Sequence, residues 1–559
     1  MDRVLNTNLP INTANVHGPL TLLLVSGLSF LLLLAILPSV DSRIKYLPLP
    51  PGASLIWGHE KAIFVGQPGS AFKDWISNFG LTFRIKAAFG APDILVLSDP
   101  MGITYLLQKK VFDYHHSAVV RPRVARLLGK GLGWIEGEEE HRRMRRLARP
   151  ALTSDNIKAM SLDITEAATR VTKDLVEFVQ NAGQKAEVNI LDWTGKATLN
   201  IVGRVAFLHD FKAGNSKEAQ DILNARKKGV SAIAKYVGFL TLMLLRRFHF
   251  LNYFPIAAIQ GQGLAKRTIH AGIAKDLIQR SQTLGDEGKY QDQKDLLTRL
   301  LLAASEERIL VSELYEHIST FMYAILTFFI TATTTINAQF SVAGFESTTT
   351  TVGFSVWELA RHPEKQRRLR EELAPFGREP TYDDLQNKAP YLEAVLKETL
   401  RLYPGLPYME RVATKADIIP LYQSIQLANG QVSHQAVVEP GQTVIIPIIA
   451  MQRQDSVWGD GDAFRPERWL EPLPPQEQLC SGWGKMLAFS DGPRSCVGTH
   501  LAIFNYKVIM SSFMNSFLFE DPNVTMRLKI SSSLQAWVHR DPDDPGRNEL
   551  PVILVPTDN

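Results

Sequence analysis

The residues most suited to chemistry lie near the C-terminus, in the segment 489–498, which reads Phe-Ser-Asp-Gly-Pro-Arg-Ser-Cys-Val-Gly. Cys496 follows Arg494 by two residues, and positive charge together with backbone N–H groups stabilises an ionised thiolate. Gly492 and Gly498 would let the backbone approach a flat ligand closely, because neither carries a Cβ. Phe489 can pack beside the sulfur, and Arg494 can pair with a carboxylate. The pattern predicts a cysteine ligand for the metal of a planar cofactor, although a lone cysteine is more commonly a small buried apolar residue.

The composition is that of a folded protein with a large core. Among 559 residues, 45% are apolar and 21% are charged, which are ordinary values for a globular chain. The net charge is only +4, and no basic run is interleaved with aromatic residues, so a nucleic-acid partner is not expected. The two cysteines, Cys480 and Cys496, are too few for a disulfide framework and favour a reducing compartment.

The N-terminal region predicts a membrane anchor. Residues 20–38 are dominated by apolar side chains and carry no charge, and a helix of this length spans the hydrocarbon core of a bilayer. The alternative is a cleaved signal peptide, but the apolar run is long and no small-x-small cleavage site follows it. Arg43 and Lys45 come after the run and place the body in the cytosol. We therefore divide the chain into a lumenal segment 1–19, an anchor 20–38, a proline-rich hinge 39–52 and a catalytic domain 53–559.

The body reads as mainly α-helical with small β-sheets. Helical periodicity is strongest over residues 154–180, 358–373 and 391–403. Shorter β-rich segments lie at 94–97 and 443–449. The sequence contains no internal repeat of fixed period, so a single, mostly helical domain is the simplest architecture.

The segment 489–498 matches the haem-ligand signature of the cytochrome P-450 family, Phe-x-x-Gly-x-Arg-x-Cys-x-Gly, at every fixed position. The resemblance covers the chain from residue 48 to its end. It implies the cytochrome P-450 fold, haem b (iron protoporphyrin IX) as cofactor, and Cys496 as the axial ligand of the haem iron. It also implies that Phe489, Arg494 and Gly498 contact the cofactor.

Two further motifs resemble the family's structural charge cluster. Lys397-Glu-Thr-Leu-Arg401 places Glu398 and Arg401 on one helical face, and residues 464–469 read Phe-Arg-Pro-Glu-Arg-Trp. An acid and an arginine three residues apart are common on surface helices, so the first motif alone is weak. By the resemblance, Glu398, Arg401 and Arg468 form a buried cluster whose role is in folding, because buried charges must satisfy one another.

An upstream helix carries candidate haem-propionate contacts. The family commonly shows Trp-x-x-x-Arg here, whereas this chain has His141 and Arg145; histidine still supplies an N–H donor. The resemblance implies that His141, Arg145 and the later Arg411 contact the propionates. The alternative for the basic stretch 142–146 is a solvated face or a docking patch for an acidic partner.

Residues 343–348, Ala-Gly-Phe-Glu-Ser-Thr, resemble the family's oxygen-activating helix. A glycine inside a helix costs roughly 1 kcal/mol relative to alanine but opens room for dioxygen and substrate. An acid followed by a hydroxyl can relay protons, so we assign this role to Glu346 with Ser347, which replaces the usual threonine, and keep Thr348 as the second candidate. The alternative is a helix cap rich in Ser and Thr.

The chain departs from the family just before this motif. Residues 322–340 contain no charge, whereas the family expects a short polar helix start. A second membrane span would split one active site across the bilayer, which excludes it. We interpret 322–339 as an irregular insertion, either genuine or a translated intron.

The substrate side is apolar. Residues 236–254 are rich in Phe, Leu, Met and Tyr, which fits a roof over a lipophilic pocket as well as ordinary core packing. The resemblance implies hydroxylation or a related oxidation of a lipophilic small molecule in secondary metabolism, with terpenoids as one candidate class. It also implies a single-pass protein of the endoplasmic reticulum membrane that receives electrons from NADPH-cytochrome P-450 reductase, with cytochrome b5 as a second donor.

Two other functions stay open. The insertion and Ser347 are compatible with a catalytically impaired haem-binding membrane protein. An isomerase of the same fold would need no external reductant. Turnover with NADPH and reductase separates all three.

Overall fold

The computed structural model describes residues 43–127, 130–207, 209–217, 219–220, 223, 232–253, 344–377, 379–530, 533–541 and 546–557. The predicted lumenal segment 1–19, anchor 20–38 and insertion 322–339 lie outside these residues. Within the described ranges, no helix has both the length and the apolar character needed to cross a bilayer.

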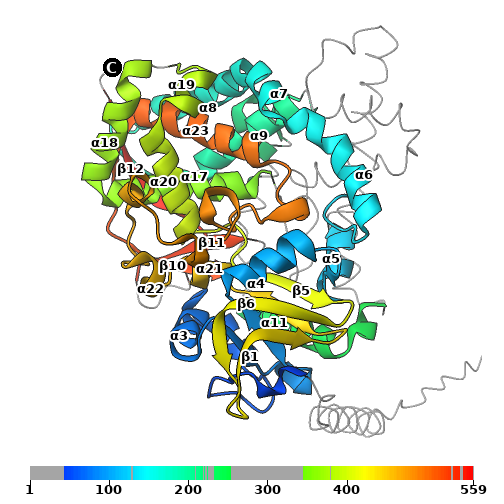
Figure 1. Cartoon of the computed structure of the whole chain (residues 1–559). Coiled ribbons are helices and arrows are strands. Elements are labelled where there is room, and N and C mark those ends of the chain that lie inside the picture. The colour runs from blue at the N-terminus through cyan, green and yellow to red at the C-terminus, as the bar shows by residue number, and fades with distance from the viewer. Residues whose placement is uncertain are drawn as a thin grey trace, which may run out of the picture.

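A helix-rich part and a sheet-rich part make up the described structure (Figure 1). In the helix-rich part, α17 is buried almost all round, with every residue from Thr348 to Ala360 inaccessible to solvent. Such a helix must be covered on all sides, and its neighbours include α9, α20 and α23. The helices of this part are α7 (Ser154–Ala159), α8 (Ser161–Asn181), α9 (Ile190–Phe207), α17 (Glu346–Arg361), α18 (Pro363–Leu373), α19 (Tyr382–Asn387), α20 (Pro390–Leu402) and α23 (Thr499–Ser516).

The structure divides two stretches, each of which the sequence predicted as one continuous helix. The stretch 154–180 is divided into α7 and α8 at Met160, whose φ of −97° and ψ of 5° leave the helical region. The stretch 358–373 is divided at His362, with φ −128° and ψ 75°, because the ring of Pro363 disfavours helical geometry in the residue before it. Helix α20 corresponds to the predicted 391–403.

The sheet-rich part is built on five strands in the order β1-β2-β8-β5-β3. The central pair β2 and β8 is parallel, with Leu95 opposite Val444, and β2 is buried on both faces, as expected for an interior strand. The bounds are β1 (Thr82–Ile85), β2 (Ile94–Leu97), β3 (Tyr114–His115), β5 (Met409–Ala413) and β8 (Thr443–Ile446). The predicted strand 443–449 ends early because Pro447 cannot donate to the sheet, and α21 (Ile448–Met451) follows.

Three smaller antiparallel sheets complete the fold. Strand β12 (Pro551–Pro556) pairs with both β4 (Ala186–Asn189) and β9 (Phe517–Glu520). The other two are hairpins, β10 (Thr525–Ile530) with β11 (Leu534–His539) and β6 (Asp417–Gln426) with β7 (Val432–Val438). The remaining α-helices are α2 (Glu60–Val65), α3 (Ser70–Phe79), α4 (Pro100–Thr104), α5 (Val120–Leu127), α6 (Glu138–Ala148), α11 (Ala232–Arg247) and α22 (Asp455–Trp458). The described chain is therefore mainly helical with small sheets, as the sequence predicts.

Candidate active site

Cys496 lies in a tight loop between the short helix η16 (Gly492–Arg494) and α23. The backbone N–H of Cys496 donates to the carbonyl of Phe489 at 2.8 Å, which closes the loop. Gly492 has a φ of +66°, and a Cβ there would lie 2.2 Å from the carbonyl oxygen of Leu107. The neighbouring backbone therefore requires glycine at position 492, a reason that the sequence did not show. A Cβ on Gly498 would lie 4.0 Å from the Cys496 sulfur, so Gly498 does border the sulfur.

The surroundings of the Cys496 sulfur act on the pKa of its thiol in two opposite directions. Burial raises the pKa of the Cys496 thiol, whereas hydrogen bonds from the Gly498 backbone and the Thr499 hydroxyl and the charge of Arg145 act to lower it. The side chain nevertheless has accessible surface. Both observations hold if the sulfur borders a hollow deep in the protein, and its depth is the better guide to its pKa. A metal bound here must displace the thiol proton.

Arg145 of α6 braces this loop. Its Nη1 donates to the carbonyl of Ser495 at 2.6 Å, and its Nη2 donates to the Ser495 hydroxyl at 3.2 Å. The sequence predicted a propionate contact for Arg145, and the structure places its guanidinium on the residue beside the cysteine. The positive charge therefore acts directly on the sulfur's surroundings.

Arg494 is held by a segment that the sequence did not single out. Its Nη1 and Nη2 donate to the carbonyls of Ile135 and Glu136, both at 2.7 Å, and Nη2 lies 3.1 Å from the Glu136 carboxylate. Its Nε is buried without a partner among the described residues. The backbone N–H and the ring of His116 bond to the same carboxylate at 2.8 and 2.6 Å.

The charge of Glu136 is stabilised by these neighbours. Burial acts to raise the pKa of Glu136, but the bonds and charge of His116, together with Arg494, outweigh it and lower the pKa to about 2. Neither Glu136 nor His116 belongs to a family motif. The one sequence feature that could have indicated Glu136 is its position just before the basic helix.

Arg411 and His141 complete the cluster. Arg411 lies on β5, and within the described residues its Nη1 donates to the carbonyl of its neighbour Glu410 at 2.9 Å. Burial lowers the pKa of Arg411 to about 10. The ring of His141 is buried and meets Phe112 edge-on at 5.6 Å. Burial, with the charges of Arg494 and Arg145, lowers the pKa of His141 to about 4, so the ring is neutral at pH 7.

This donor set fits haem. Arg145 contacts the residue beside the cysteine, Arg494 precedes the cysteine by two residues, and Arg411 lies within the electrostatic reach of Arg494. Within the described residues, only the guanidinium of Arg494 among these three is paired with a carboxylate. A buried surplus of positive charge is costly unless a ligand compensates it. Haem b supplies two propionates for that surplus and an iron for the sulfur.

On α17, Glu346 is anchored to the last part of the chain. Its Oε1 accepts from the Ser533 hydroxyl at 3.0 Å and from the Gln535 amide at 2.7 Å. The Thr348 hydroxyl donates to the carbonyl of Gly344 at 3.3 Å, so its proton is engaged by its own helix. Ser347 is half-buried beside the turn that contains Gly405.

The helix-cap alternative does not describe these residues. The residue before α17 is Phe345, which makes no side-chain cap. Ser347 and Thr348 therefore lie inside the described helix, where their hydroxyls do not serve as N-caps.

The structure brings Glu398, Arg401 and Arg468 together. Glu398 Oε1 accepts from Arg401 and Arg468 at 2.8 and 3.0 Å, and Oε2 accepts from Arg401 and Trp469 at 2.9 and 3.0 Å. Arg401 also donates to the carbonyls of Gln452, Gly461 and Ala463. All three charged residues are buried, so each polar atom finds its partner within the protein.

Part of the predicted roof, residues 236–254, is described as α11 and the short helix η7 (His249–Tyr253). Arg246 of α11 is half-buried between two carboxylates, with Glu60 at 3.2 Å and Glu410 at 2.6 Å. Since Glu410 precedes Arg411, this bridge ties α11 to the strand that carries a cofactor candidate.

A thiol in a closed loop, with surplus cations beside it, is the arrangement that a haem-thiolate protein requires. Residues 48–543 match the sequence model of the cytochrome P-450 family, and the chain therefore belongs to that family of monooxygenases, which bind haem b and act on small molecules with a redox partner. The chain is 28% identical over 507 residues to cytochrome P-450 monooxygenase claQ of Ampulloclitocybe clavipes, covering 89% of this chain and 91% of the relative. It is 27% identical over 536 residues to cytochrome P-450 monooxygenase 205 of Postia placenta, with coverages of 92% and 93%.

Proposed function

We propose that this monooxygenase inserts one oxygen atom of dioxygen into a lipophilic small molecule of secondary metabolism, with terpenoids as the first class to test. The observation that carries the proposal is Cys496, closed in its loop by Phe489 and braced through Ser495 by Arg145. Fungal relatives that carry the name monooxygenase support it.

The residues around the sulfur have separate roles in this proposal. Cys496 is the iron ligand, and Arg411, Arg494 and His141 hold the propionates, with the unpartnered Nε of Arg494 as one available donor. Phe489 and Gly498 border the ring. Arg145 positions the loop through Ser495. When bound, haem supplies the oxygen chemistry.

Protons reach the reaction through α17 in this proposal. Glu346 and Ser347 carry them, with Thr348 as the alternative hydroxyl. Because Glu346 accepts bonds from Ser533 and Gln535, it is held as an acceptor, and these two residues orient it. The half-buried Ser347 is the hydroxyl closer to the Gly405 turn.

The same proposal places the enzyme on the endoplasmic reticulum membrane, anchored by residues 20–38 with residues 53–559 in the cytosol. Exposed apolar side chains near the start of the described chain support this, including Leu55 at 84% exposure and Val65 at 59%. Phe250, next to α11, is 55% exposed. Electrons come from NADPH-cytochrome P-450 reductase, with cytochrome b5 as a second donor, and the basic face of α6 is a docking surface of suitable charge.

The test uses the full-length, haem-loaded protein. Reduction under carbon monoxide should give the red-shifted Soret band of thiolate ligation, and Cys496→Ala should lose it. Cys480→Ala is the matched control and should keep it. A wild-type protein without this band would contradict the assignment of Cys496.

Turnover then separates the functions. With reductase, a monooxygenase consumes NADPH and dioxygen and hydroxylates a member of a terpene, polyketide and fatty-acid panel. The band without turnover on any member favours the impaired haem protein. A rearranged product without NADPH favours the isomerase. Sequencing the transcript decides whether 322–339 is encoded in the mature message.

A further inference from the structure

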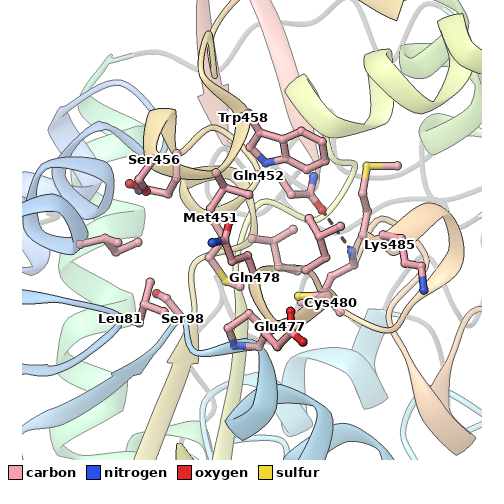
Figure 2. A pocket seen from close by; sticks show the side chains of 18 of the residues that line it. Leu81, Ser98, Met451, Gln452, Ser456, Trp458, Glu477, Gln478, Cys480 and Lys485 are labelled. Carbon is pink, nitrogen blue, oxygen red and sulfur yellow. Dashed lines mark hydrogen bonds between the residues drawn. The ribbon is translucent and has the colours of Figure 1, made fainter. Parts of the chain in front are cut away.

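A pocket of about 280 Å³ lies apart from the candidate haem site. It is formed where α3, β6, α21 and α22 meet the segment 477–487 (Figure 2). Neither Cys496 nor any of the cofactor candidates near it lines this pocket. Since one water molecule needs only ~10–15 Å³ of such space, the pocket is large enough for a small organic ligand.

The interior of the pocket is mostly apolar. Ile448, Trp458, Met486 and Leu487 are buried and form its walls together with the half-buried Met451. Exposed polar residues lie at the rim, namely Ser456, Glu477, Gln478 and Lys485. Walls of this kind with a polar rim are typical of sites for small lipophilic molecules.

One buried polar atom in the wall lacks a partner. The side chain of Ser98 is 2% exposed, and its hydroxyl oxygen has no hydrogen-bond partner among the described residues. Figure 2 places Ser98 among the side chains around the hollow. A buried hydroxyl without a partner is unfavourable by about 1–3 kcal/mol.

The glutamines of the same wall have partners. Gln452 donates to the carbonyls of Leu400 and Arg401, both at 3.1 Å, and Gln454 donates to that of Ala450 at 3.3 Å. The carbonyl of the Gln423 side chain accepts from the Leu81 backbone at 3.1 Å. Ser98 is thus the buried group in this wall that a ligand would satisfy.

We propose that this pocket is a second binding site, for one small lipophilic alcohol or ketone whose oxygen bonds to the Ser98 hydroxyl. The apolar walls select the hydrocarbon part of the ligand, and Ser98 fixes the oxygen. The proposal goes beyond the monooxygenase reaction and does not depend on turnover.

The pocket also contacts the segment that leads to the cysteine. The Leu487 backbone donates to the Gln452 side chain at 3.1 Å, and its carbonyl accepts from Ser490 at 2.9 Å. Phe489 then accepts from Cys496 at 2.8 Å. A ligand against Leu487 would therefore contact a residue that is hydrogen-bonded to Ser490, in the segment that leads into the haem-ligand loop.

Calorimetric titration of the full-length, haem-loaded protein with 4-tert-butylcyclohexanone tests the site, with tert-butylcyclohexane as the probe that lacks the oxygen. We expect a ketone-binding event, distinct from any in the haem pocket, that Ser98→Ala weakens about fivefold, the effect of one hydrogen bond. Binding of the hydrocarbon to the same pocket should be unchanged. Ser456→Trp, at the exposed mouth, should abolish the ketone-binding event. Thr82→Val removes another buried, unpartnered hydroxyl that lies outside the pocket, and should change nothing.

An intact carbon monoxide band in each variant shows that the fold is preserved. Binding of the ketone in the haem pocket would persist in Ser456→Trp and does not bear on the second site. If Ser456→Trp removes no ketone-binding event, the pocket holds no ketone and the proposal is overturned.

Discussion

Two clusters of arginines, one buried and one half-buried, differ in how completely the protein satisfies their hydrogen bonds and charges. In the first cluster, Glu398 accepts from Arg401, Arg468 and Trp469, and both arginines also donate to backbone carbonyls. In the second, near Cys496, Glu136 is the single carboxylate in direct contact with a described guanidinium, that of Arg494.

The difference separates a folding role from a binding role. A buried ion pair whose atoms are all bonded within the chain needs no ligand, and removal of one partner leaves an uncompensated charge. A surplus of half-buried cations is unfavourable in the chain alone and becomes favourable when an anionic ligand binds. Arg411 is such a cation, with one bond to a backbone carbonyl within the described residues. Loss of a charge that is paired within the chain should therefore destabilise the protein, whereas loss of the unpaired Arg411 should not.

The largest effect is expected at the first cluster. Glu398→Ala should lower the free energy of unfolding by about 3–5 kcal/mol, because it leaves two buried guanidinium groups unpaired. Urea unfolding followed by tryptophan fluorescence measures it. Replacing the whole cluster with Met at 398 and 401 and Leu at 468 should recover much of the loss, and a single-variant loss below ~1 kcal/mol would show that the cluster is not structural.

The second effect depends on pH. Glu136 has a folded pKa of about 2 against an ordinary 4.5, so its charge stabilises the fold above pH 4.5 and this contribution disappears as pH falls toward 2. Glu136→Gln should thus cost about 3 kcal/mol at pH 7 and progressively less below pH 4.5. Urea unfolding between pH 3 and 7 measures the trend, and a cost that is independent of pH would contradict it.

Arg411→Gln should reverse the pattern of the first cluster. We expect the free energy of unfolding of the haem-free protein to be unchanged or raised, since a half-buried charge without a carboxylate partner is removed. Haem should transfer to apomyoglobin about tenfold faster, the effect of one charge-assisted hydrogen bond. Destabilisation of the haem-free protein as large as that of Glu398→Ala would remove the distinction between the clusters.

The smallest effect is expected on the exposed face of α6. Arg142 pairs with Glu138 at 2.6 Å, but the two side chains are 68% and 56% exposed, and such pairs contribute within ~0.5 kcal/mol. Arg142→Ala should therefore leave thermal unfolding unchanged. A larger loss of thermal stability would mean that burial does not explain the differences among the arginine variants.

The fold class and the segments around Cys496 and Glu398 were accessible from sequence, because each motif is a fixed local spacing. The helix breaks at Met160 and His362 were harder to predict, because the hydrophobic periodicity continues across both. Only Pro363 indicated the second break. The partners of the site residues could not be predicted. Arg145 meets Ser495 across 350 residues of chain, and Glu346 meets Gln535 across 189.

The sequence by itself determined the family, the cysteine that can hold iron, and the acid and arginine types that accompany it, because these depend on residue identity at short spacing. Only the tertiary structure decided that Glu136 and His116 lie beside Arg494. It also decided that the backbone of Leu107 leaves no room for a Cβ at Gly492, and that the Ser98 hydroxyl is buried without a partner among the described residues. Packing brings distant segments together, and it is packing that sets which buried polar groups are satisfied.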